Sequence, residues 1–475
     1  MSRAPPYDDC RGLTMTSPRA GFAGDMPNQD LSGRSLTRDD AGYDAARRGT
    51  MWNANVPARF PDRIVRASSV DDVIAAVRAA KADGKHVGVR SGGHGWSGNH
   101  MRDGGVVIDL SGLTDLTVDK GAMTATAGPG IGGSDLLKTL MKEGLFFPVG
   151  HCRGVALGGY LLQGGFGWNS RMVGPACENV TAIDYVDADG ELRHASETEN
   201  EEMLWAARGA GPGFFGVVVR FHLRLHRKPA FIGMQAIQYP VERLEDLVRW
   251  MGEIGPSVPP QVELQFIVSR NPSFPPPIRR ATRTSPVRIE LVAPVMAESR
   301  SAAKAATSFL STRPKGARVR TPLVPVPLSS MFSGVMQHYP AATNWETDNL
   351  WTHASADELL PHLLSVAAAM PPPPAHMLWL NWAPPPSRPD MAFSVEDLTY
   401  LAFYGGWKDP SDAAGTTAWS RGNVSAMQPL STGVQFADDP GRPSRAVSET
   451  AQARLDALRA QHDPDGRFHR WIGST

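Results

Sequence analysis

Two glycine-rich segments contain the residues whose chemistry the sequence shows most directly. The first reads Arg90-Ser91-Gly92-Gly93-His94-Gly95 and follows an expected strand at His86–Val89. A turn of small residues after a strand exposes successive backbone N–H groups, which form a concave site for anionic oxygen atoms such as those of a pyrophosphate. Arg90 and Ser91 add side-chain donors. The segment is neither a GxGxxG dinucleotide motif nor a Walker P-loop, so taken alone it is a weak signal.

The second segment starts at Gly150, contains Cys152, and carries five glycines between positions 158 and 167. Glycine costs backbone entropy in helices and strands, so helix or strand packing does not explain this density. A glycine-rich loop packed under a helix is the alternative interpretation. Two glycine-rich segments with exposed backbone in one region favour binding of a long ligand that carries phosphates and rings.

Alternating helices and strands position both segments within the region 27–228. Ser69 precedes an amphipathic run that ends at Ala82, which predicts an N-capped helix, and a second helix is expected at Ser134–Glu143. Short runs rich in β-branched residues predict strands between and after them. The expected strands are His86–Val89, Val106–Leu110, Thr124–Ala127, Val180–Val186 and Gly216–Leu225. This alternation predicts an α/β lobe.

Residues 229–429 differ in composition, with proline-rich connectors, and their apolar patterns predict a second lobe whose four strands form one sheet. The expected strands are Glu263–Ser269, Val287–Ala293, Met377–Trp382 and Leu398–Phe403, and the expected helices are Val241–Ile254, Ser299–Leu310 and Ala356–Met370. Residues 1–26 lack periodicity, which predicts a mobile tail. Residues 430–475 contain a helix expected at Ser448–Gln461.

The composition excludes several functional classes. The chain has 475 residues, enough for two or three domains, and its 48 Lys and Arg balance 48 Asp and Glu. This balance gives no bulk attraction for nucleic acid or for an anionic membrane surface. No stretch is apolar enough to span a bilayer and the N-terminal residues lack a secretory signal pattern, so a cytoplasmic location is expected. Three cysteines make no disulfide framework, no metal site is predicted, and the oligomeric state stays open.

Several motifs together resemble a known family. The segments RSGGHGW and GHCRGVALGGYLLQGGFGW, with SRMVGPACENV and the C-terminal HDPDGRF, resemble the berberine bridge enzyme branch of the vanillyl-alcohol oxidase family of flavoproteins. The resemblance implies a two-lobed α+β FAD-binding fold, with an α/β cofactor lobe at 27–228 and an antiparallel-sheet substrate lobe at 229–429. It also implies that residues 430–475 return to the cofactor lobe.

The resemblance implies a bicovalently bound FAD. His94 occupies the position where this family bonds histidine to the flavin 8-methyl group, and Cys152 the position where bicovalent members attach cysteine to C6. A hydrogen-bonded loop histidine and a small buried cysteine are the alternative interpretations. Two tethers would leave the cavity open for a bulky substrate. The other implied cofactor residues are Arg90, Ser91, Gly92, Gly93, Gly95, Gly128, Gly130, Val155, Gly158, Gly159, Asn179 and Ile183.

The general base is less clear from the sequence. Many sugar-oxidising members of the family carry Tyr-x-Asn near the end of the second lobe, where this chain reads Gln435-Phe436-Ala437. An amide cannot act as a base at ordinary pH, which places that mechanism in doubt. Strand alternation puts Tyr400 and Tyr404 on one face of their strand. The replacement candidates are Tyr400, Tyr404, Glu396 and His353, although packed aromatic or solvated residues are the alternative for each.

We therefore expect an FAD-dependent oxidase that abstracts hydride from an alcohol, amine or aromatic natural product and reduces dioxygen to hydrogen peroxide. Val155 matches a family position above the oxygen-reacting face of the flavin, where a short β-branched residue resembles the oxidases. The alternatives are an oligosaccharide oxidase that forms lactones, which Gln435 disfavours, and a dehydrogenase that uses another electron acceptor. A flavin carrier without turnover and a nucleotide-binding protein without flavin are the remaining alternatives.

Overall fold

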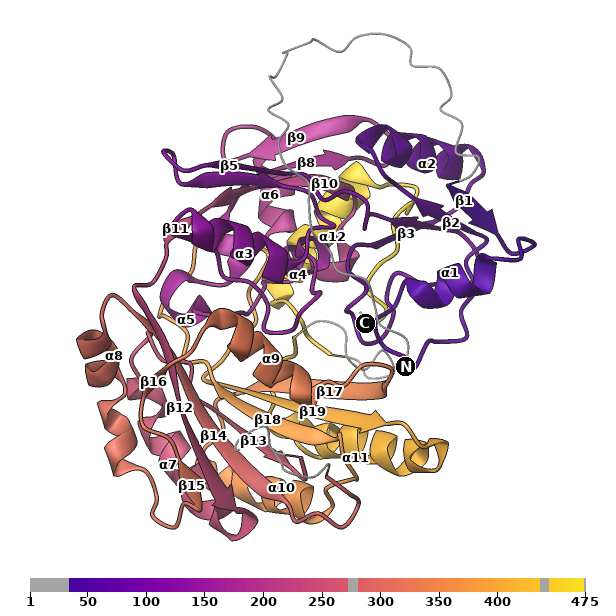
Figure 1. Ribbon diagram of the computed structural model, residues 1–475. Helices are drawn as coiled ribbons and strands as arrows, with labels where there is room; N and C mark the ends of the chain where they lie inside the picture. The colour runs from indigo at the N-terminus through magenta and orange to yellow at the C-terminus, as the bar shows by residue number, and fades with distance from the viewer. Residues whose placement is uncertain (1–33, 272–280, 436–443, 474–475) are drawn as a thin grey trace, which may run out of the picture.

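The computed structural model describes residues 34–271, 281–435 and 444–473, which form two lobes that meet along one boundary (Figure 1). The first lobe comprises residues 34–227 and 444–473, and the second comprises residues 231–430. The expected tail at 1–26 lies outside the described residues, as do Phe436 and Ala437. No helix in the described ranges combines the length and the apolar character needed to cross a membrane.

The first lobe combines two sheets with short helices. Its helices are α1 (Tyr43–Gly49), α2 (Val70–Ala82), α3 (Gly133–Lys142), α4 (Leu157–Leu162), α5 (Ser170–Val173), α6 (Glu201–Ala207) and α12 (Glu449–His462). Its strands are β1 (Ser35–Thr37), β2 (Arg63–Arg66), β3 (Val87–Arg90), β4 (Val106–Asp109), β5 (Leu116–Asp119), β6 (Thr124–Ala127), β7 (Leu145–Phe146), β8 (Val180–Val186), β9 (Leu192–Ser196), β10 (Val217–Arg224) and β11 (His226–Arg227). The larger sheets have the strand orders β1-β2-β4-β3 and β5-β6-β10-β8-β9, and β2, β4 and β3 run parallel.

The second lobe is one antiparallel sheet covered by helices. Its strands are β12 (Phe231–Pro240), β13 (Gln265–Ser269), β14 (Arg288–Ala297), β15 (Val319–Arg320), β16 (Val324–Pro325), β17 (Asn344–Thr352), β18 (His376–Asn381) and β19 (Thr399–Trp407). Its helices are α7 (Leu244–Ile254), α8 (Arg300–Ala306), α9 (Leu328–His338), α10 (Ala356–Ala368) and α11 (Ala413–Ala426). The strand order is β15-β12-β14-β13-β18-β19-β17, and β16 pairs with β12.

Local sequence signals explain the helices that frame the first lobe. Ser69 caps α2 by accepting a hydrogen bond from the backbone N–H of Asp72, whose side chain accepts one from the backbone of Ser69 in return. This capping box satisfies two N–H groups that the helix leaves without partners. The apolar face of α2 packs on the sheet through Val73 and Val77, both fully buried.

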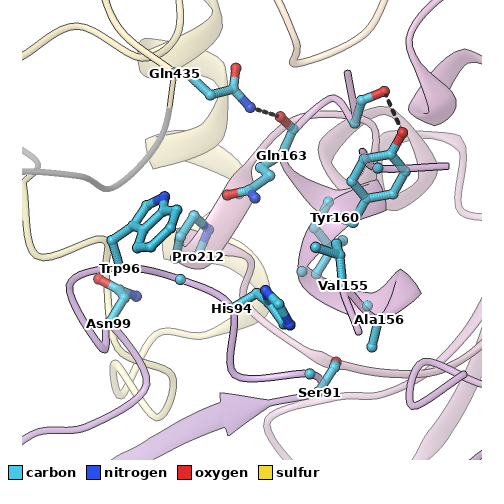
Figure 2. Close-up of a pocket in the computed structure, with 18 of the residues that line it drawn as sticks. Ser91, His94, Trp96, Asn99, Val155, Ala156, Tyr160, Gln163, Pro212 and Gln435 are labelled. Carbon is cyan, nitrogen blue, oxygen red and sulfur yellow. Dashed lines mark hydrogen bonds between the residues drawn. The ribbon is translucent and has the colours of Figure 1, made fainter. Parts of the chain in front are cut away.

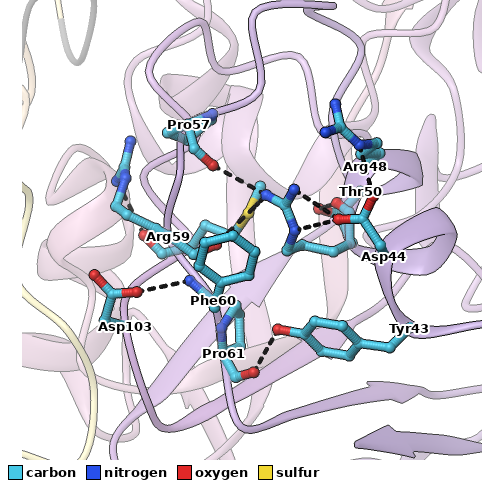
Figure 3. Close-up of polar contacts among 11 residues, drawn as sticks. Tyr43, Asp44, Arg48, Thr50, Pro57, Arg59, Phe60, Pro61 and Asp103 are labelled. Carbon is cyan, nitrogen blue, oxygen red and sulfur yellow. Dashed lines mark hydrogen bonds and ion pairs between the residues drawn. The ribbon is translucent and has the colours of Figure 1, made fainter. Parts of the chain in front are cut away.

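The segment between α1 and β2 is held by polar contacts and supports the first glycine-rich loop (Figure 3). Buried Arg47 donates to the carbonyl oxygen of Pro57 over 3.0 Å, and the Tyr43 hydroxyl donates to the carbonyl oxygen of Pro61 over 2.5 Å. The same segment places the carbonyl oxygen of Thr50 3.1 Å from Nε of Arg90. The residues after α1 therefore help to position the loop that begins at Arg90.

Arg171 joins the two lobes through carbonyl oxygens and forms no ion pair with a carboxylate in the described part of the chain. Arg171 on α5 donates to four carbonyl oxygens of the second lobe, those of Val258, Pro259, Val262 and Trp382, at distances of 2.6–3.1 Å. The guanidinium group offers five donors in a rigid plane, which suits several carbonyl acceptors at once. Arg171 thus fixes the second lobe against the wall of the first.

The predicted α+β fold with an antiparallel second sheet is confirmed. The four strands expected in the second lobe do lie in one sheet, as β13, β14, β18 and β19. The sequence patterns did not predict β12, β17, α9 and α11. One interpretation is wrong: Gly158 lies inside α4, and an added Cβ would come within 2.0 Å of Oγ of Ser91, so packing does explain this glycine.

Candidate active site

A cavity of about 410 Å³ runs between the lobes and brings both glycine-rich segments together. Twelve of the residues expected from the sequence line this cavity. They are Arg90, Ser91, Gly92, Gly93, His94, Gly95, Cys152, Val155, Gly158, Gly159, Tyr400 and Tyr404. Residues from the first lobe form one wall, and the sheet of the second lobe forms the other.

The two glycine-rich loops interlock at three close approaches. A Cβ added to Gly92 would lie 2.8 Å from the backbone nitrogen of Ala156, and one added to Gly154 would lie 2.9 Å from Nε2 of His94. Gly154 also has a positive φ of 83°, which side chains rarely adopt. The close packing of Gly158 against Ser91 is the third approach. These glycines are therefore needed so that the loops can share one surface.

His94 lies in the wall of the cavity (Figure 2). Its ring stacks on Trp52 with centroids 5.2 Å apart and an angle of 19° between the planes. The backbone N–H of Trp52 donates to the carbonyl oxygen of Gly93 over 2.9 Å, which fixes the loop beside the ring. Burial, with a smaller contribution from the charge of Arg90, lowers the pKa of His94 to about 4. The imidazole is therefore neutral at neutral pH and keeps a nitrogen lone pair.

Cys152 lies where the two lobes meet. It is a free cysteine that packs against the aromatic cluster of Tyr339, Trp345 and Tyr404 from the second lobe. Burial raises the pKa of its thiol to about 12. The preceding residue, His151, places Nε2 2.8 Å from Oε1 of Glu263, so this loop also contacts the second lobe.

The first-lobe wall fits a dinucleotide such as FAD. Gly95 and Gly159 line the cavity, and a Cβ added to either would meet no protein atom within 4 Å. Glycine at these positions therefore leaves space beside the exposed backbone. Arg90 also lines the cavity, and its guanidinium is held by Asp109 at 2.7 Å. Backbone N–H groups and one arginine are donors suited to phosphate oxygens, while His94 and Cys152 are nucleophiles on the same wall.

The second-lobe wall is built by strand register. Along β19, Tyr400 pairs with Leu380 and Tyr404 pairs with His376 of β18. Ala402, midway between the two tyrosines, pairs with Leu378. Tyr400, Tyr404, His376, Leu378 and Leu380 all line the cavity, whereas Leu401 and Phe403 pack into the core on the opposite face. Alternation along the strands therefore separates the cavity wall from the core, as the sequence predicted for the two tyrosines.

Burial keeps two titratable side chains of this wall, His376 and Tyr339, uncharged. Burial, followed by the nearby charge of His338, lowers the pKa of His376 to about 3, and Nδ1 of His376 contacts the carbonyl oxygen of Pro374 at 3.0 Å. Burial raises the pKa of Tyr339 well above its usual value. Gln435 also lines the cavity, and its Nε2 donates to the carbonyl oxygen of Gln163 over 3.0 Å (Figure 2).

Four residues expected to contact the cofactor do not line the cavity. A Cβ on Gly128 or Gly130 would come 2.3 or 2.5 Å from carbonyl oxygens of the 110–113 turn, so these glycines permit backbone packing. Ile183 is fully buried in β8. Asn179 is also fully buried, and Oδ1 lies 2.9 Å from Nε2 of His226.

Two of the four candidate bases also lie away from the cavity. Glu396 is held by Nε of Arg388 at 2.7 Å and accepts from Nε1 of Trp382 over 2.6 Å. His353 has a side chain that is 68% exposed and lies 2.8 Å from Asp397. Glu396 precedes β19 and His353 follows β17, so both lie at sheet ends outside the cavity, where Glu396 pairs with Arg388 and His353 contacts Asp397.

Several lining residues were not identified from the sequence. Val335, His338 and Tyr339 come from α9 and the residue that follows it, and Gln265 and Ile267 come from β13. Leu328, Met331, Phe332 and Val335 recur with helical spacing, which was the available signal for α9. No local pattern indicates that its last turn faces the cavity, because that depends on how α9 crosses the sheet.

A separate group of metal-ligand types lies in the first lobe. Potential ligand atoms of Asp184, His194 and His222, from β8, β9 and β10, all lie within 4.8 Å of one another. Nη1 of Arg220 already lies 3.1 Å from Oδ2 of Asp184, so a cation occupies part of this carboxylate. The group does not line the cavity.

The comparisons with known proteins agree with this site. An FAD binding domain model matches residues 61–196. An FAD-linked oxidoreductase, nodO from Hypoxylon pulicicidum, is 30% identical over 425 residues, which covers 88% of this chain and 92% of that protein. The structure of a berberine bridge enzyme-like protein from Physcomitrella patens matches with a TM-score of 0.80 and 19% identity, covering 92% of this chain and 95% of that one.

A second structural comparison concerns the use of oxygen. The grass-pollen protein Phl p 4, a glucose dehydrogenase, matches with a TM-score of 0.74 and 19% identity, covering 92% of this chain and 96% of that one. A variant of Phl p 4 that has valine in place of one isoleucine is a glucose oxidase, and it matches with a TM-score of 0.73 and 20% identity, covering 92% and 96%.

Proposed function

This chain belongs to the berberine bridge enzyme-like branch of the FAD-linked oxidases, and on this premise we propose that it oxidises an alcohol, amine or aromatic natural product with a bicovalently bound FAD. The observation that carries the proposal is that His94 and Cys152 line the same cavity as Tyr400 and Tyr404 of β19. When bound, FAD supplies the hydride acceptor, and dioxygen regenerates it with release of hydrogen peroxide.

The first lobe holds and orients the cofactor. Backbone N–H groups of the two loops and the side chains of Arg90 and Ser91 are the donors for its phosphates. His94 would hold the flavin through its 8-methyl group, the role that its family position implies, and its neutral imidazole keeps the lone pair that this bond needs. Cys152 would be the second tether, at C6. These two bonds would keep the flavin in place while the rest of the cavity stays open to substrate.

The second lobe excludes water and positions the substrate. Leu378, Leu380 and Ile267 give apolar contact, while Tyr400 and Tyr404 offer hydroxyl groups at two points along one strand. A substrate bound between them is held close to the first-lobe wall, and restricting its orientation in this way accelerates transfer of a hydride.

Val155 supports an oxidase over a dehydrogenase. It lines the cavity and matches the family position above the oxygen-reacting face of the flavin. In Phl p 4, replacing one isoleucine with valine is associated with oxidase activity. The short side chain of Val155 is consistent with the same preference here. Replacing Val155 with Ile should slow reoxidation of reduced flavin by dioxygen at least about tenfold, while anaerobic reduction by substrate stays within about twofold.

Two experiments test the proposal. Acid-precipitated protein should stay yellow, and peptides that contain His94 and Cys152 should carry the added mass of the flavin. A colourless pellet with unmodified peptides would contradict the covalent attachment. Separately, anaerobic mixing with vanillyl alcohol, tetrahydroisoquinoline and xylobiose should bleach the flavin with at least one compound, and dioxygen should then restore the colour with formation of hydrogen peroxide. No bleaching with any compound would favour a flavin carrier.

A further inference from the structure

A buried histidine and a buried glutamate meet behind the substrate wall. His338 lines the cavity, yet it is only 4% exposed, and its Nε2 has no hydrogen-bond partner among the described residues. Oε2 of Glu290, which is 2% exposed, lies 3.7 Å from that nitrogen. A small movement of either side chain would close this distance to a hydrogen bond. The histidine therefore lies between the cavity and a carboxylate.

Strand register explains how the carboxylate reaches this place. Glu290 on β14 pairs with Ile267 on β13, and Ile267 lines the cavity. Residues paired across antiparallel strands share a face of the sheet, so Glu290 lies on the cavity face. The last turn of α9 crosses this face and places His338 near Glu290.

Two features of the fold favour a positive charge on His338. Oε2 of Glu290, 3.7 Å from Nε2, is placed to accept a hydrogen bond from an imidazolium. His338 is also the last residue of α9, and the C-terminal end of a helix favours a cation. Against these, burial lowers the pKa of His338 to about 4, which keeps the ring unprotonated and able to accept a proton at neutral pH. This combination suits a residue that is neutral before a reaction step and charged after it.

We propose that His338 is the general base of the reaction and that Glu290 is the residue that positions it. This inference rests on the proposed function. In the step, the O–H or N–H bond of the substrate breaks and its proton bonds to a ring nitrogen of His338. The electron pair left behind forms the new C=O or C=N π bond, while the neighbouring C–H bond breaks and its hydride leaves to the bound flavin. Oε2 of Glu290 then accepts a hydrogen bond from the imidazolium and so stabilises it.

The neighbouring polar residues are less suited to this role. The ring centroid of His376 lies 5.3 Å from that of His338, and its Nδ1 contacts the Pro374 carbonyl oxygen. Within the described residues, no carboxylate pairs with His376. Tyr339 packs on His376 and on Tyr404, and its burial opposes formation of the tyrosinate. The titratable groups around His338 are thus Glu290 from β14, His376 from β18 and, beyond His376, the two tyrosines.

The first test separates proton transfer from substrate binding. With the compound that bleaches the wild-type flavin fastest, His338→Gln should reduce flavin about 100-fold more slowly or worse, while the dissociation constant for that compound changes less than about threefold. His362→Gln, on α10 and away from the cavity, is the matched control and should behave like wild type. If no compound bleaches wild type, the proposed function fails and this inference fails with it. If His338→Gln keeps the wild-type rate, the base assignment alone is wrong.

The second test uses the basicity of an added molecule. In His338→Ala, added imidazole should increase the rate of flavin reduction at least about tenfold. 1,2,4-Triazole has a similar size but is a far weaker base, so it should increase this rate much less. Equal rescue by both would show that the side chain only fills space, and would overturn the proposal. No rescue by imidazole would overturn it too, if flavin content and compound binding match wild type.

The third test concerns Glu290 and does not need turnover. NMR titration of histidine-labelled holoenzyme, with the His338 signal assigned by its loss in His338→Gln, should show at least about tenfold lower proton affinity of His338 in Glu290→Gln. The proton affinity of His338 falls because Glu290→Gln removes the carboxyl group that stabilises the imidazolium. The acid limb of the pH–rate profile should then move to lower pH, with a lower plateau. Identical titration in wild type and Glu290→Gln would exclude the positioning role of Glu290.

Discussion

The two walls of the cavity are built in different ways. The first-lobe wall comes largely from two continuous segments, whose glycines let one loop contact the other. The second-lobe wall is made of separate side chains that come from β13, β17, β18, β19 and the end of α9. A wall made of backbone depends on small residues in fixed order, whereas a wall made of side chains depends on strand register. The residues that bind the cofactor can therefore be predicted from local motifs, whereas the residues that bind the substrate cannot.

Replacing Gly158 should break the first wall most strongly. In Gly158→Ala the new Cβ would lie 2.0 Å from Oγ of Ser91, so one of the loops must shift. We expect the flavin content of purified protein to fall at least about tenfold, as measured by the ratio of absorbance at the flavin band to that of the protein, because preorganised donors would lose their positions.

Gly415→Ala is the matched control for this prediction. Gly415 lies within α11 and has no atom within 4 Å of an added Cβ, so the change should leave flavin content unaltered and stabilise the helix by up to about 1 kcal/mol. Normal flavin content in Gly158→Ala would show that the loop contact is dispensable, and the contrast between the two walls would lose its basis.

Removing Arg171 should weaken the join between the walls. Arg171→Leu leaves four carbonyl oxygens of the second lobe without their donor, and we expect the free energy of unfolding to fall by about 3 kcal/mol. Denaturant unfolding of the flavin-loaded protein measures this change. Burial lowers the pKa of Arg171 only to about 10, so the loss should be the same from pH 6 to pH 8.

Arg171→Lys tests whether the planar donor group matters. Lysine keeps the charge but cannot reach four acceptors in one plane, so most of the loss should remain. Full stability in Arg171→Lys would indicate that charge alone holds the lobes together.

The smallest effects should come from residues that the sequence suggested as bases but that lie outside the cavity. His353→Gln removes an exposed pair with Asp397, and such pairs contribute about 0–1 kcal/mol. We expect rates of anaerobic flavin reduction within about twofold of wild type. A rate of flavin reduction that falls tenfold or more, with unchanged stability, would mean that His353 contributes to the substrate wall although it does not line the cavity.

The sequence predicted the fold more completely than it predicted the site. Periodicity and capping located α2, α3, α7, α10 and α12 close to their observed bounds, because these signals depend on neighbours along the chain. The strand of Tyr400 and Tyr404 was also predicted, and alternation placed both on one face. Glu396 and His353 have the right chemistry for a base, but Glu396 pairs with Arg388 and His353 contacts Asp397, both outside the cavity.

The sequence by itself determined the two glycine-rich loops, with His94 and Cys152 inside them, and the division into an α/β lobe and a second lobe with one sheet. Only the tertiary structure decided that His338 lines the cavity and that Glu290 lies beside it. The physical reason is the separation along the chain of the residues that interact. Backbone conformation and periodicity follow from residues a few positions apart, whereas the meeting of a helix end with a strand depends on how whole elements pack.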